Sequence, residues 1–171
     1  MKNVFLTGFM GCGKSRVARC LSAWYGAPCI ETDQMVEQQA GCSVRELFET
    51  KGEAFFRQLE REVLHSIPDY AVVATGGGLP CQSDNMDWML SQGHVFYLQV
   101  PAGLLAQRLD TPSSRARRPL LPPEKDLSGY VRTTLAAREP FYLRADHIID
   151  AGVRSTQEVV REIIDIICTL P

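Results

Sequence analysis

The sequence predicts a three-layer α/β/α domain, in which a parallel β-sheet is covered by helices on both faces. Short apolar runs typical of buried strands alternate with longer segments of helical periodicity. A glycine-rich loop joins the first of these runs to the first helix. A chain of 171 residues, 45% of them hydrophobic, suits one core, so we expect a single domain over residues 1–171.

The first strand is expected at 3–8 (NVFLTG) and the first helix at 14–26, where Gly26 would end it. Between them, residues 8–15 (GFMGCGKS) fit the phosphate-loop pattern G-x-x-x-x-G-K-[ST]. Glycines let backbone amides approach an anion, and a helix N-terminus adds further donors. We expect ATP phosphates to contact Gly11, Cys12, Gly13, Lys14, Ser15 and Arg16. Lys14 would be catalytic and reach the outer phosphates, while Ser15 would bind Mg²⁺. The alternative is a glycine-rich turn with an incidental lysine.

A second strand is expected at 27–32 (APCIET), and polar groups follow it. Parallel strands bring their carboxyl ends to one edge, where ligands bind. Asp33 could orient an acceptor hydroxyl or take its proton, or it could cap the next helix. Glu31 could hold the water shell of Mg²⁺. The helical region 33–62 is expected to bind the substrate.

Within that region, Ser43 and Glu46 predict a capping box that opens a helix. The next segment, 53–66, has helical periodicity, with Phe55, Leu59 and Val63 expected on one apolar stripe. Arg57 lies near acidic residues, so a surface ion pair competes with a role in binding.

The third strand is expected at 70–76 and ends in three glycines, Gly76–Gly78. Such a run is either a plain turn or a place where backbone amides touch a small ligand. Strands follow at 94–100 and 147–150, and a last helix at 156–170 would bury Val159, Ile163 and Ile166. Arg138 precedes Pro140, where its helix should kink or break, and it is otherwise an ordinary surface arginine.

The stretch 109–126 is rich in proline and arginine and lacks periodicity, which predicts an exposed, mobile loop. It is either an ordinary solvated loop or a lid, about 110–125, that closes over phosphates.

Composition argues against several partners. The net charge of −2 gives no field that favours nucleic acid or a membrane surface. The six cysteines lack metal-ligand spacing, so we expect reduced thiols in a cytoplasmic protein. No signal peptide or long apolar run is evident. We also expect the protein to be a monomer.

Six motifs together carry a resemblance: GFMGCGKS, ETD, FFRQLE, ATGGGLP, RRPLL and AAREPFY, in this order. Over nearly the whole chain, the sequence resembles the shikimate kinase family. The resemblance implies a nucleoside monophosphate kinase-like fold with strand order 2-3-1-4-5. It also implies transfer of the γ-phosphate of ATP to the 3-hydroxyl of shikimate, in aromatic amino acid biosynthesis. The family often has D-x-D where this chain has Glu31-Thr32-Asp33.

The resemblance also implies roles for single residues. Asp33 would hold the ring hydroxyls and act as a base, and Gly77 and Gly78 would contact shikimate through the backbone. Two arginines, Arg57 and Arg138, would bind the shikimate carboxylate. The residues that would contact the nucleotide from outside the phosphate loop are Arg118, in the lid and catalytic, and Arg108 and Arg154, which would flank adenine.

The sequence is also compatible with other functions. A gluconate kinase would also need arginines, and a nucleoside monophosphate kinase would share the phosphate loop. A nucleotide-binding switch would lack an acceptor substrate. A structural or nucleic-acid partner using the arginine-rich loop would show salt-dependent binding.

Overall fold

A five-stranded parallel sheet lies at the centre of the computed structural model, which describes residues 2–82, 84–117, 121–122 and 124–170. In their order across the sheet, the strands are β2 (Cys29–Glu31), β3 (Val72–Ala74), β1 (Asn3–Thr7), β4 (Gly93–Gln99) and β5 (His147–Asp150). The predicted fold class and strand order 2-3-1-4-5 are therefore confirmed.

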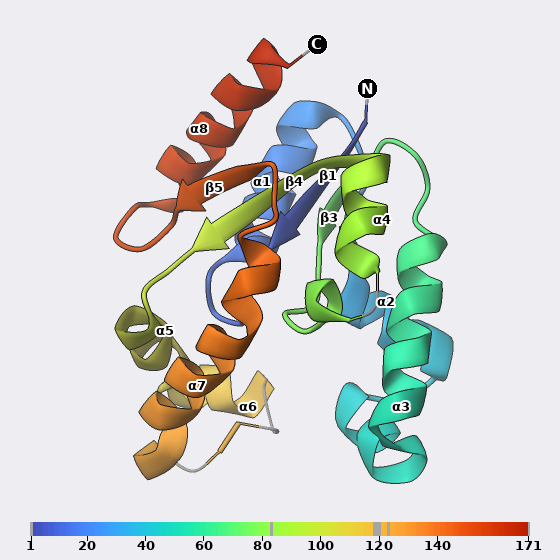
Figure 1. Cartoon of the computed structure of the whole chain (residues 1–171), viewed down its shortest axis with the longest axis vertical. Helices are drawn as coiled ribbons and strands as arrows, with labels where there is room; N and C mark the ends of the chain where they lie inside the picture. The colour runs from blue at the N-terminus through green and yellow to red at the C-terminus, as the bar shows by residue number, and fades with distance from the viewer. Residues whose placement is uncertain (1, 83, 118–120, 123, 171) are drawn as a thin grey trace.

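Helices cover both faces of this sheet (Figure 1). They are α1 (Lys14–Tyr25), α2 (Thr32–Ala40), α3 (Val44–His65), α4 (Asn85–Gln92), α5 (Ala102–Leu109), α6 (Pro112–Arg117), α7 (Glu124–Tyr142) and α8 (Thr156–Thr169), with a 3₁₀ turn, η1, at Leu79–Cys81. No helix in the described part of the chain is long and apolar enough to cross a membrane.

Successive side chains of β1 point to opposite faces of the sheet and so contribute to two separate hydrophobic cores. Val4 and Leu6 face the layer that holds α1 and α8, including Val159 and Ile163. Phe5 points to the opposite face, where it joins Met86 of α4. Because both faces of a parallel sheet are covered, its strands are apolar throughout and their period-2 signal is weak.

The predicted helix ends are confirmed where local chemistry fixes them. Gly26 ends α1 in the left-handed conformation, at φ 67°. Ser43 caps α3, and Glu46 completes the capping box. Helix α2 begins at Thr32 with Glu31 at its N-cap position, so Asp33 lies in the first turn and does not cap the helix.

Three expectations were wrong in part. Phe56 rather than Phe55 joins Leu59 and Val63 in a buried cluster, since the spacing 56, 59, 63 keeps one helix face; Phe55 is 45% exposed. Residues 112–117 of the predicted loop form α6. Helix α7 does not break at Pro140 but continues to Tyr142; the proline lies in the last turn, where only two residues follow it, so little of the helix depends on the turn that it weakens.

Candidate active site

The glycine loop between β1 and α1 has the backbone that its sequence requires. Gly8 and Gly13 have φ values of 137° and 107°, in the region that favours glycine. Gly8 also has no room for a side chain, since a Cβ there would lie 2.9 Å from the Leu98 carbonyl oxygen. Gly13 is the N-cap of α1 and offers no side-chain cap, so the loop presents this helix N-terminus to an anion.

Lys14 lies across the loop that precedes it. Its Nζ donates to the carbonyl oxygens of Gly8, at 2.7 Å, and Phe9, at 3.0 Å, and lies 3.6 Å from the Cys12 sulfur. These contacts hold the ammonium group at the centre of the loop. Cys12 is buried, which suits a small side chain that packs beneath the loop.

The Ser15 hydroxyl donates to Glu31 Oε2 at 2.6 Å, and Arg19 donates to Glu31 Oε1 at 2.8 Å. Partial burial opposes ionisation of Glu31, but these two hydrogen bonds and the charge of Arg19 outweigh it, so the pKa of Glu31 is lowered. The hydroxyl and the ionised carboxylate are hard oxygen donors. They fit Mg²⁺, which keeps several waters and needs few protein ligands. Among the described residues, no group of three Asp, Glu, His or Cys side chains could form an all-protein metal cage.

Three predicted substrate residues converge on the glycines after β3. A Cβ on Gly76 would lie 2.3 Å from Asp33 Oδ1, and one on Gly78 would lie 2.8 Å from Arg57 Nη1. A Cβ on Gly77 would lie 3.5 Å from Arg138 Nη1 and 3.5 Å from the Gly8 carbonyl oxygen. The run of glycines therefore brings the backbone against Asp33, both arginines and the phosphate loop.

Arg57 comes from α3, on one side of this meeting point. Its Nη1 donates to Glu60 Oε2 at 2.6 Å, while its Nε and Nη2 donate to Glu53 Oε1. Glu60 is only 2% exposed, and its burial raises the pKa to about 7, although Arg57 pulls it down. The ion pair that was the alternative for Arg57 is thus present, with one partner exposed and one buried, and it holds the guanidinium beside Gly78.

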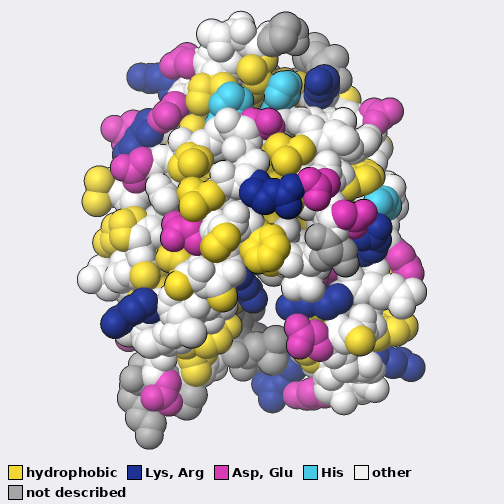
Figure 2. Space-filling view, in the orientation of Figure 1, with side chains coloured by type: hydrophobic (Ala, Val, Ile, Leu, Met, Phe, Trp, Pro, Cys, Tyr) yellow, Lys and Arg dark blue, Asp and Glu magenta, His cyan; other side chains and the backbone are white. Residues whose placement is uncertain are grey.

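Arg138 comes from α7, on the other side. Its guanidinium carbon lies 5.8 Å from the centre of the Phe9 ring, a cation–π contact with the phosphate loop. Figure 2 shows the molecule hollowed between α7 and α3, with Lys or Arg side chains visible on the walls of the hollow. A cleft with cations at its walls favours an anionic ligand.

Asp33 is exposed in the first turn of α2, yet the protein around its carboxyl limits its hydration. That desolvation raises the pKa of the Asp33 carboxyl, with the charge of Lys14 opposing the shift. A carboxylate with a raised pKa is a better proton acceptor than an ordinary one.

The remaining predicted residues lie farther out. Arg108 donates to the carbonyl oxygens of Gly11, Ala151 and Gly152, so it ties the phosphate loop to the loop after β5. Arg154, beside that loop, pairs with Glu162. Arg16 is exposed in the first turn of α1. Arg118 lies outside the described residues.

Sequence reasoning gave no role to two residues of this site, although both end motifs quoted above, FFRQLE and AAREPFY. Glu60 follows Arg57 by three positions, and Tyr142 follows Arg138 by four, so both spacings place the pairs on one helix face. Tyr142 is fully buried, and its hydroxyl donates to the Gly77 carbonyl oxygen at 2.5 Å. The motifs and this spacing were the signals that could have identified them.

The sheet order and the phosphate loop define a P-loop domain. Beside the loop, Arg57 and Arg138 form a candidate site for a second, anionic ligand. The family model for shikimate kinase matches residues 10–168, so the chain belongs to the shikimate kinase family.

Known shikimate kinases are similar to this chain over most of their length. The enzyme of Bacteroides thetaiotaomicron is 37% identical over 88% of this chain and 87% of its own. That of Parabacteroides distasonis is 35% identical over 95% of both chains. Among solved structures, a shikimate kinase from Acinetobacter baumannii in complex with shikimate has a TM-score of 0.90 and 31% identity, over 99% of this chain and 94% of that one.

Proposed function

We propose that the chain transfers the γ-phosphate of ATP to the 3-hydroxyl of shikimate and releases shikimate 3-phosphate and ADP. Family membership supports this reaction. The observation that carries the proposal is the convergence of Asp33, Arg57 and Arg138 on Gly76–Gly78, which lie beside the phosphate loop. An acceptor bound there would have one face toward a nucleotide.

The phosphate loop holds the triphosphate in this proposal. Phosphoryl transfer needs little covalent help, so the protein acts by alignment and by compensating charge. The amides of Gly11–Arg16 bind phosphate oxygens, and Lys14 exchanges its carbonyl contacts for the outer phosphates. When bound, Mg²⁺ neutralises phosphate charge; Ser15 would bind it directly and Glu31 through water.

The acceptor side supplies position and a proton acceptor. The guanidinium groups of Arg57 and Arg138 bind the shikimate carboxylate, for which their planar donors are suited. Gly77 and Gly78 contact the ring through the backbone. Asp33 holds the reacting hydroxyl in line and accepts its proton, which its raised pKa favours.

The outer residues complete the proposal. The segment 110–125 acts as a lid whose Arg118 neutralises the transferring phosphate and whose closure excludes water. The region 33–62 binds the acceptor, and Arg108 and Arg154 border the adenine. We propose that the protein works as a monomer in the cytoplasm, with no nucleic-acid partner.

One assay tests the reaction. ADP release is measured with MgATP alone and with shikimate, gluconate or CMP added. Stimulation by shikimate only is expected. Stimulation by gluconate or CMP would assign another acceptor, and slow release that no acceptor changes would indicate a nucleotide switch.

A further inference from the structure

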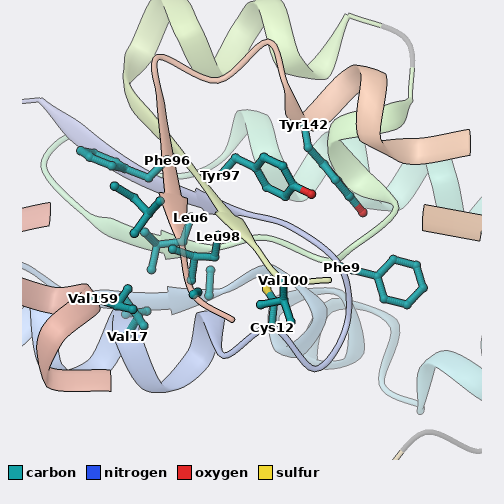
Figure 3. Close-up of a cluster of buried hydrophobic side chains, with 14 of the residues drawn as sticks. Leu6, Phe9, Cys12, Val17, Phe96, Tyr97, Leu98, Val100, Tyr142 and Val159 are labelled. Carbon is teal, nitrogen blue, oxygen red and sulfur yellow. The ribbon is translucent and has the colours of Figure 1, made fainter. Parts of the chain in front are cut away.

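A buried tyrosine, Tyr142, lies next to Gly77 in the proposed acceptor site. Tyr142 is fully buried in the core cluster that includes Tyr97 and Phe9 (Figure 3). Its ring packs against Tyr97 with centroids 5.1 Å apart, and Figure 3 shows the two hydroxyl ends pointing the same way. The two hydroxyls nevertheless bind different partners.

The hydroxyl of Tyr142 reaches the glycine run, because it donates to the Gly77 carbonyl oxygen at 2.5 Å. That of Tyr97 donates instead to Glu139 Oε1 at 3.1 Å. A buried hydroxyl needs a partner, and either contact satisfies this need. Only the bond from Tyr142 joins α7 to the glycines that follow β3.

Arg138 completes the contact between these elements. It lies one helical turn before Tyr142, and its Nη1 is 3.5 Å from where a Cβ on Gly77 would stand. A second link is weaker: the Cys81 thiol lies 3.9 Å from the Arg138 carbonyl oxygen. Gly77, Arg138 and Tyr142 therefore meet at one point.

The end of α7 needs such an anchor. Pro140 has no backbone N–H, so the last turn lacks one of the hydrogen bonds that would fix its direction. Arg138 lies in the turn that this gap weakens. A bond from Tyr142 to the opposite loop restores the constraint from outside the helix.

We propose that Tyr142 is a positioning residue, which sets the place of the Arg138 guanidinium relative to Gly77 and thereby governs acceptor affinity. This inference rests on the proposed function, since it deepens the account of the same acceptor site. Among the described residues, the Tyr142 hydroxyl bonds to Gly77 and, unlike Lys14, makes no hydrogen bond to the phosphate loop. Its effect should therefore fall on the acceptor and spare the nucleotide.

The test compares Tyr142→Phe with Tyr97→Phe in the full chain. Each variant keeps its ring and loses one buried hydroxyl, so similar losses of thermal stability are expected. Steady-state rates are measured against shikimate at saturating MgATP, and against MgATP at saturating shikimate. Tyr142→Phe should raise KM for shikimate about tenfold, the worth of one such hydrogen bond, and change KM for MgATP less than about twofold. Tyr97→Phe should leave both values within about twofold.

A second readout follows the loop directly. Hydrogen exchange at residues 75–82 should be faster in Tyr142→Phe than in Tyr97→Phe. An unchanged KM for shikimate, an equal rise in both KM values, or unchanged exchange would overturn the inference while the wild-type activity still supports the proposed function. A wild-type chain without shikimate-dependent ADP release would overturn the proposed function, and the acceptor role of Tyr142 with it.

Discussion

Replacing Gly76 with alanine tests whether the approach of the glycines to Asp33 matters for the reaction. A Cβ at this position would lie 2.3 Å from Asp33 Oδ1, whereas ordinary contact begins near 3.4 Å, so the carboxylate must move by about 1 Å. Glu60 Oε1, at 3.1 Å, must yield slightly. Gly76 is not among the glycines with positive φ, so alanine fits its backbone. The side chain of Asp33 can rotate, and we expect the fold to survive.

The cost should therefore appear in catalysis rather than in stability. A displacement of about 1 Å in a positioning group costs about 100-fold in rate, or about 2.7 kcal/mol. Coupled ADP release should show kcat/KM for shikimate reduced by about this factor, with thermal unfolding within a few degrees of wild type. Gly129→Ala is the matched control, because its Cβ would meet nothing within 4 Å on an exposed face of α7. It should be more stable by about 1 kcal/mol and fully active. If Gly76→Ala keeps a kcat/KM within about threefold of wild type, the close approach of Gly76 to Asp33 does not matter for catalysis and the reasoning is refuted.

Three further predictions follow from the site. Lys14→Met should abolish turnover and leave a folded chain by circular dichroism; a near-normal kcat would show that the phosphate loop is wrongly assigned. Arg138→Ala should raise KM for shikimate far more than KM for ATP, and equal changes would argue against a carboxylate contact. Because the pKa of Glu60 is raised to about 7 in the fold, its carboxyl stays protonated in the native state at pH values where the unfolded chain has already lost the proton. The contribution of Glu60 to the free energy of unfolding should therefore fall by up to about 3 kcal/mol as pH rises from about 4.5 to about 7. Urea unfolding at several pH values checks this: the decrease in the free energy of unfolding over that range should be absent in Glu60→Gln.

Local sequence was sufficient to predict those features whose structure depends on neighbouring residues. The phosphate loop, the end of α1 at Gly26 and the capping box at Ser43 depend on residues within a few positions of one another. Loops and helix surfaces were less predictable. The segment 112–117 has proline and no apolar stripe, so its sequence gave no sign of α6, and packing selected Phe56 over Phe55.

The amino-acid sequence alone determined the class of fold, the anion-binding loop and the carboxylate and arginines available for an acceptor. The reason is that turns, caps and strand ends obey short-range sterics and hydrogen bonding. Only the tertiary structure decided that Gly76–Gly78 lie against Asp33, Arg57 and Arg138, and that Tyr142 binds the Gly77 carbonyl oxygen. These contacts join β3 to α2, α3 and α7. Close packing of elements distant in the chain sets such distances, and no local pattern encodes them.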